Sequence, residues 1–121
     1  MVDDNVLIKD CVQHWNRLIK WMKKQKGRVI FLDYERMKED IGECWYRDDC
    51  ALCKEYYKNW CVDCPLCKKY GSCGDSSSKN LYGSVRNAVM WETATKKAIK
   101  FRNQLKRLIT KDGVREQLRG E

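Results

Sequence analysis

Seven of the eight cysteines of this chain lie between Cys44 and Cys73, spaced C-x5-C-x2-C-x7-C-x2-C-x2-C-x5-C. The block contains three Cys-x2-Cys pairs, namely Cys50/Cys53, Cys61/Cys64 and Cys64/Cys67. A Cys-x2-Cys pair chelates metals well, because a tight turn lets both sulfur atoms face one tetrahedral ion, at about 2.3 Å for zinc. The spacing therefore predicts chemistry at sulfur, as a metal site or as a set of disulfides.

Structural zinc is the metal site that this spacing favours, with Cys50 and Cys53 as the firmest pair of ligands. Four thiolates close the coordination sphere of zinc and leave no position for a catalytic water, so we expect a site that stabilises the fold. The candidates for the other ligands are Cys44, Cys61, Cys64, Cys67 and Cys73.

Six cysteines between residues 50 and 73 exceed one tetrahedral site, and this surplus leaves alternatives open. A second zinc could share bridging thiolates, or four of the cysteines could hold an iron–sulfur cluster, although the spacing is not that of bacterial ferredoxins. The remaining thiols could also pair as disulfides. Residues 1–10 lack the basic start and long apolar run of a secretory leader, so we expect a reducing compartment, where metal binding is favoured over disulfides.

Two more residues that can ligate metals lie near the N-terminus. Cys11 falls on the apolar stripe of a predicted helix, and we interpret it as a small buried hydrophobic residue rather than a ligand. His14 is the only histidine, and a packing or surface role is favoured over metal ligation. No hydrolytic triad, phosphate-binding glycine loop or histidine-rich open metal site is evident, so we do not expect an enzyme.

Positive charge is concentrated in the C-terminal third of the chain. The formal net charge is +8, and residues 81–121 alone hold ten basic and four acidic residues. Polyanions are attracted to such a segment, which makes nucleic acid the leading partner. The residues predicted to contact phosphates are Lys96, Lys97, Lys100, Lys106 and Arg107.

The cysteine block is also rich in aromatic residues interleaved with lysines. Such side chains usually form the small core around a bound ion. If Tyr57 and Trp60 are instead exposed, they could stack unpaired bases or bind a protein partner. A protein-interaction module is accordingly the alternative function, and an iron–sulfur or thiol redox protein is a weaker one.

The elements that must position these residues are mainly helical. The residues before Gly27 predict a long amphipathic helix with the apolar stripe Ile8, Cys11, Trp15, Leu18 and Met22. After Gly27, the run Val29 to Leu32 is predicted to be a strand or a buried connector. A short helix is then expected, with Tyr34, Met37 and Ile41 on one face and Gly42 at its end. From about Leu81 a second long helix has the predicted buried stripe Val85, Val89, Ala94, Ala98, Phe101, Leu105 and Leu108. We expect one domain in which residues 1–42 and 81–121 pack together and residues 43–80 form a metal-binding knuckle.

The run Cys50-Ala51-Leu52-Cys53, followed by Cys61-Val62-Asp63-Cys64-Pro65-Leu66 and then Gly71-Ser72-Cys73, resembles small cysteine-rich proteins of bacteriophages and prophages. The resemblance covers roughly residues 44–90, and Cys44 and Cys67 depart from the pattern. It implies a metal-binding module with ligands among Cys50, Cys53, Cys61, Cys64 and Cys73, and it carries no established activity.

No apolar run approaches the roughly 18–20 residues of a membrane span. Together with the phage resemblance, this predicts a phage-type accessory protein in the cytoplasm of a bacterial host, without a membrane partner. The expected mode of action is binding, with a structural metal site that holds the fold.

Overall fold

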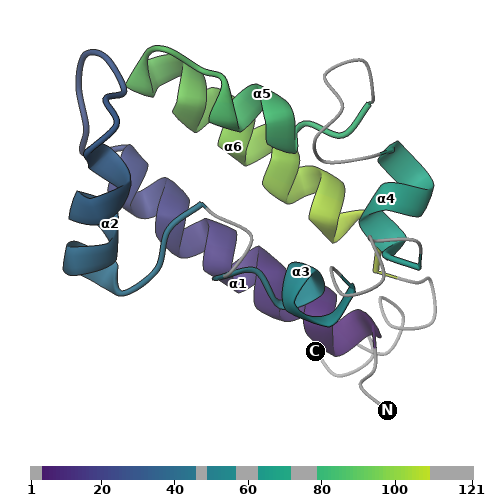
Figure 1. Cartoon of the computed structure of the whole chain (residues 1–121). Coiled ribbons are helices and arrows are strands. Elements are labelled where there is room, and N and C mark those ends of the chain that lie inside the picture. The colour runs from purple at the N-terminus through teal and green to yellow at the C-terminus, as the bar shows by residue number, and fades with distance from the viewer. Residues whose placement is uncertain (1–3, 46–48, 57–62, 72–78, 110–121) are drawn as a thin grey trace, which may run out of the picture.

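The computed structural model describes residues 4–45, 49–56, 63–71 and 79–109. These residues contain the helices α1 (Asp4–Met22), α2 (Asp33–Ile41), α3 (Ala51–Tyr56), α4 (Pro65–Tyr70), α5 (Tyr82–Arg86) and α6 (Trp91–Lys106) (Figure 1). No strand occurs among the described residues, which have only an isolated antiparallel bridge between Arg28 and Met90. The predicted mainly helical class is thus confirmed.

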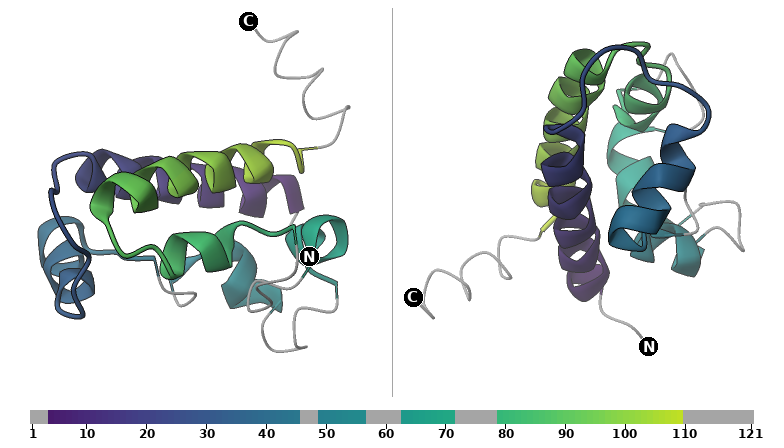
Figure 2. Two further views of the ribbon diagram at one scale, coloured as in Figure 1. Left: turned by 90° about the horizontal axis from the view of Figure 1, so that it is seen from above. Right: turned by 90° about the vertical axis from the view of Figure 1, so that its left-hand side faces the viewer.

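The two long helices, α1 and α6, lie side by side and run in opposite directions (Figures 1 and 2). The apolar residues of α1 recur every three or four positions and so face one side. The predicted stripe of α1 is buried at every position, that is at Ile8, Cys11, Trp15, Leu18 and Met22. Helix α6 buries Trp91, Ala94, Ala98, Phe101 and Leu105 in the same core.

The four shorter helices form a second layer against the α1–α6 pair (Figure 2). Aromatic side chains fill the space between the layers. The Trp15 ring lies edge-on to the rings of Tyr82 and Phe101, with centroids 6.2 and 5.0 Å away. The Trp91 ring is in edge contact with Trp21 and Trp45, at 5.4 and 6.1 Å. Edge-to-face pairs of this kind add to the area that each ring buries.

The prediction of one long helix from Leu81 is wrong, because the helical structure is interrupted between α5 and α6. Met90 is extended, with φ −113° and ψ 144°. Val85 and Trp91 are both buried, yet in one continuous helix they would point about 120° apart. The break lets both side chains reach the core, and it leaves Val89, which was predicted to be buried, 55% exposed.

The segment after Gly27 is neither of the two predicted structures. Its backbone meets the α5–α6 break, where Val29 N–H donates to the carbonyl of Val89 at 2.7 Å and Trp91 N–H donates to that of Gly27 at 2.9 Å. The apolar residues that follow are exposed rather than buried, at 54, 76 and 55% for Ile30, Phe31 and Leu32. The run therefore connects two elements at the surface.

The predicted short helix is present as α2, and it ends at Gly42 as expected. Gly42 has φ 77°, the left-handed conformation that glycine adopts most readily, and its N–H donates to the Lys38 carbonyl. Asp33 is the first helical residue, and its buried carboxylate accepts the N–H of Ile30 at 2.8 Å and pairs with Arg36 at 2.6 Å. The position of α2 beside the end of α1 is held by Trp21 Nε1, which donates to Asp40 Oδ2 at 2.7 Å.

Candidate functional site

The cysteine block folds into two short helices, each of which begins directly after a cysteine. Cys50 precedes α3 and Cys53 lies in its first turn, while Cys64 is the N-cap of α4 and Cys67 lies in its first turn. Pro65 at the first position of α4 fits that start, since proline needs no amide hydrogen there. Both described Cys-x2-Cys pairs are therefore held on helical turns.

The two Cys-x2-Cys pairs line one small cavity of about 20 Å³. That volume is close to the space of one water-sized particle. The remaining lining is almost entirely apolar and comes from Trp15, Trp45, Leu52, Leu66, Tyr82 and Phe101. Four sulfur-bearing side chains thus converge on the core between the layers.

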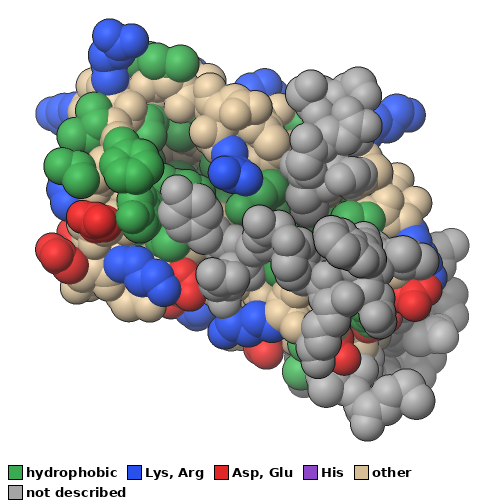
Figure 3. Space-filling model, viewed as in Figure 1, with side chains coloured by type: hydrophobic (Ala, Val, Ile, Leu, Met, Phe, Trp, Pro, Cys, Tyr) green, Lys and Arg blue, Asp and Glu red, His purple; other side chains and the backbone are tan. Residues whose placement is uncertain are grey.

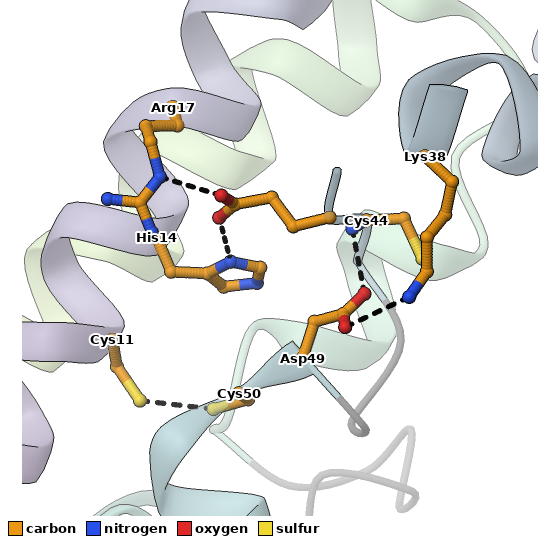
Figure 4. A network of polar contacts seen from close by, with 8 residues as sticks. Cys11, His14, Arg17, Lys38, Cys44, Asp49 and Cys50 are labelled. Atoms are coloured by element: carbon orange, nitrogen blue, oxygen red, sulfur yellow. Dashed lines mark hydrogen bonds and ion pairs between the residues drawn. The ribbon is translucent and has the colours of Figure 1, made fainter. Parts of the chain in front are cut away.

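A fifth sulfur approaches this group from α1. Cys11 Sγ lies 3.1 Å from Cys50 Sγ, and Cys11 is fully buried (Figure 4). The N–H of Leu52 also donates to Cys11 Sγ, at 3.3 Å. The hydrogen bond with Cys11, and a second one with Cys53, hold the pKa of Cys50 well below its usual range. The bond with Cys50, reinforced by burial, raises the pKa of Cys11.

His14, one turn after Cys11 on α1, takes part in a partly buried polar network (Figure 4). Its Nδ1 lies 2.5 Å from Glu43 Oε1, and Arg17 Nε donates to Glu43 Oε2 at 2.8 Å. Burial acts to raise the pKa of Glu43, but the hydrogen bonds from Arg17 and His14 outweigh it and lower that pKa below 4.5. His14 is 3% exposed, and its Nε2 has no hydrogen-bond partner among the described residues.

Asp49 holds the start of the cysteine block in place. Its carboxylate accepts the backbone N–H of Cys44 at 2.9 Å and pairs with Lys38 at 3.1 Å. Burial acts to raise the pKa of Asp49, but the bonds from Cys44 and Lys38 lower it overall. Cys44 itself is fully buried in the core. Such a position is typical of a cysteine that packs in the hydrophobic core.

The predicted metal knuckle is not confirmed. Among the described residues, no three or more histidine, cysteine, aspartate or glutamate side chains are arranged so that they could hold a metal ion. No disulfide joins any two of the six described cysteines. The candidate ligands Cys61 and Cys73, and the candidate contact residues Tyr57 and Trp60, lie outside the described residues.

The predicted phosphate-contacting residues do not all share one side of α6. Lys96, Lys100 and Arg107 are exposed and lie within about 40° of one another around the helix axis. Lys97 is half-buried, and Lys106 is exposed on a different side. One acidic neighbour, Glu92, pairs with Lys96 at 3.3 Å in an exposed i,i+4 pair.

Sequence reasoning missed the contribution of α1 to the cysteine block. Cys11 was expected to be a buried hydrophobic residue, and it is buried, but its sulfur contacts Cys50. The signal was the spacing of Cys11 and His14, which places them on one face of the helix, three residues apart. Nothing in the spacing indicated that this face would meet Cys50 or Glu43.

No protein-family model, curated protein or solved structure matches this chain. Of the helices in the described ranges, none has the length and apolar character needed to cross a membrane.

Proposed function

We propose that this chain is a phage-type accessory protein that acts by binding nucleic acid and whose helical fold is stabilised by zinc. The basic stripe of α6, formed by Lys96, Lys100 and Arg107, is the observation that carries the proposal. Lysine and arginine side chains on one exposed face can contact phosphates and release their counterions on binding.

The zinc part of the proposal rests on the sulfur-bearing residues around the small cavity. Cys50 and Cys53 would be ligands, because both line the cavity and are in contact with each other. Four cysteines facing one small space in an otherwise apolar core suit a soft, tetrahedral ion. Bound zinc would supply part of the folding free energy of a segment that has few aliphatic residues.

The nucleic-acid proposal is tested by titrating labelled single-stranded and double-stranded oligonucleotides at 50 to 200 mM salt. The variant Lys96→Gln/Lys100→Gln should weaken binding and reduce the slope of log K against log salt by about 1.4–1.8, since each phosphate contact contributes about 0.7–0.9. The matched control Lys54→Gln/Lys79→Gln removes the same charge from other exposed positions. Affinity that is independent of salt, or an equal loss in both variants, contradicts the proposal.

A second candidate function, the capture of a host protein, is favoured by an exposed apolar patch. The patch consists of Ile30, Phe31, Leu32, Val89 and Met90, which are 43–76% exposed. Hydrophobic side chains gather over this end of the molecule, near α2 (Figure 3). Clustered exposed apolar side chains are characteristic of protein-binding surfaces.

This second function is tested with a purified candidate partner, such as a host polymerase or nuclease, in a binding titration. Phe31→Ser should weaken the complex at least tenfold, because a large exposed ring at the centre of an interface is a typical hot spot. Val6→Ser, at an equally apolar and 50% exposed position on α1, is the control. Retention of full affinity by Phe31→Ser would exclude the patch as the interface.

The weaker alternative, an iron–sulfur or thiol redox protein, is separated from zinc by elemental analysis of protein purified without oxygen. Stoichiometric zinc in a colourless preparation excludes a cluster, whereas iron with inorganic sulfide establishes one.

A further inference from the structure

We propose that helix α1 supplies two ligands to the ion, Cys11 and His14, which complete a Cys₃His site with Cys50 and Cys53. This inference rests on the proposed zinc site and changes its ligand set. The sequence places Cys11 and His14 together as Cys-x2-His, and the fold brings that motif to the Cys-x2-Cys pair at the start of α3.

The sulfur atom of Cys11 on α1 already contacts that of Cys50, at the start of α3. Cys11 Sγ and Cys50 Sγ are 3.1 Å apart, and Cys50 is hydrogen-bonded to Cys53. Three sulfur atoms thus form a connected group contributed by two helices. Two thiolates on one tetrahedral zinc lie about 3.8 Å apart, given bonds of about 2.3 Å, so binding requires only a small separation of the pair.

His14 has the arrangement expected of a metal-binding imidazole. Ligating histidines usually donate their second ring N–H to a carboxylate, which fixes the tautomer and leaves the other nitrogen to bind the metal. Nδ1 of His14 is held by Glu43, which is fixed in turn by Arg17. In the neutral tautomer that donates its Nδ1–H to Glu43, Nε2 has the lone pair, and this atom is buried without a hydrogen-bond partner in the described part of the chain.

An orphaned buried nitrogen has a cost, because a polar atom removed from water without a partner destabilises the fold by about 1–3 kcal/mol. Coordination to a metal removes that cost. In Figure 4 the edge of the imidazole opposite Glu43 turns toward the side of the site where Asp49 and Cys50 lie. His14 and Cys11, three residues apart, lie on the same face of α1.

The four side chains do not surround a common point as they stand. Bringing them onto one ion would require the thiols to rotate about their side-chain bonds toward the imidazole that Glu43 holds, while the helices are already packed. The resulting site would link α1 to α3 directly. The ion would then stabilise the contact between residues 1–42 and the cysteine block.

The test uses the full-length protein loaded with ¹¹³Cd²⁺, whose NMR resonance reports how many thiolates surround each ion. We expect one resonance of a Cys₃His site. His14→Cys should keep the ion and move that resonance to the position of a four-thiolate site, while Cys11→Ser should abolish it. Cys64→Ser and Cys67→Ser, at cavity positions outside the proposed set, should leave it in place.

The outcomes separate this inference from the zinc proposal. Protein that binds cadmium and zinc through four thiolates, unaffected by His14→Cys and lost in Cys64→Ser, would overturn the role of α1 and retain the zinc site. Protein that binds neither ion would overturn both. Circular dichroism of each metal-free variant, compared with the metal-free wild type, identifies any variant that has lost its fold.

Discussion

At the scale of single residues, Glu43 connects two side chains of α1, those of His14 and Arg17. It accepts hydrogen bonds from His14 and Arg17 with a side chain that is only 18% exposed. A carboxylate held by two partners fixes both of them, and here it sets the orientation of the His14 ring. The stability of the contact between Glu43 and α1 should therefore depend on the charge of the Glu43 carboxylate.

We predict that Glu43→Gln lowers the free energy of unfolding at pH 7 by about 1–3 kcal/mol, because hydrogen bonds to a charged acceptor are replaced by weaker ones. Urea denaturation followed by tryptophan fluorescence measures the change. Glu39→Gln, at an exposed position of α2, is the matched control and should shift stability by less than about 0.5 kcal/mol. Equal losses in the two variants would contradict a special role for Glu43.

The same residue predicts a pH dependence with a definite sign. The pKa of Glu43 is lower in the folded protein than its ordinary 4.5, so its contribution is complete above pH 4.5 and is lost as the pH falls through the folded pKa. The stability difference between wild type and Glu43→Gln should therefore shrink below about pH 4.5. Denaturation curves from pH 7 down to pH 3 test this, and a constant difference over that range would count against it.

At the scale of elements, the end of α2 depends on one backbone conformation. Gly42 has φ 77°, and a Cβ placed there would meet no atom within 4 Å. Any cost of a substitution must then come from the left-handed backbone itself, since no steric clash adds to it. A substitution at Gly42 therefore measures the cost of backbone strain without a contribution from packing.

We predict that Gly42→Ala destabilises the protein by about 1–2 kcal/mol and that Gly42→Asn recovers part of the loss, because asparagine tolerates the left-handed region better than alanine. Thermal and urea unfolding of the three proteins measure the order. Equal stability of the alanine and asparagine variants would show that the conformation at position 42 is not the cause.

The break between α5 and α6 shows why element boundaries were harder to predict than element type. Residues 81–109 have a helical spacing of apolar residues, and no proline interrupts them. The break occurs because Val85 and Trp91 both find room in the core and because the backbone of residues 27–29 offers hydrogen bonds to Val89 and Trp91. Those partners lie some 60 residues away in the chain.

At the scale of the whole molecule, the core depends on one aromatic centre. Trp15 is 1% exposed and contacts the rings of His14, Tyr82 and Phe101, which come from three segments of the chain. It also borders the cavity lined by cysteines. Packing of the two layers and the geometry of the site are thus joined at this residue.

We predict that Trp15→Ala costs about 3–5 kcal/mol, a large part of the roughly 5–15 kcal/mol that holds a domain folded. Chemical denaturation should show a correspondingly lower midpoint. Trp15→Phe, which keeps an aromatic ring, should lose less. If alanine and phenylalanine proved equally stable, the ring contacts described for Trp15 would not matter to the fold.

Metal removal tests the whole molecule in another way. If zinc is bound only by the folded chain, stability rises with free zinc, by about 2.7 kcal/mol at a hundred times the dissociation constant. We therefore expect a chelator to lower the melting temperature and added zinc to restore it, as followed by circular dichroism. A melting temperature that does not change with chelator or zinc would rule out a metal that contributes to folding.

The sequence by itself determined the helical class, the buried stripe of α1, the extent of α2 and its glycine end, and the clustering of cysteines. These features depend on residues close together in the chain, so periodicity and spacing are enough to predict them. Only the tertiary structure decided that Cys11 meets Cys50, that Glu43 holds His14, and that α5 and α6 are separate helices. Each depends on contacts between residues distant in the chain, which are set by how the apolar faces pack and which local patterns do not encode.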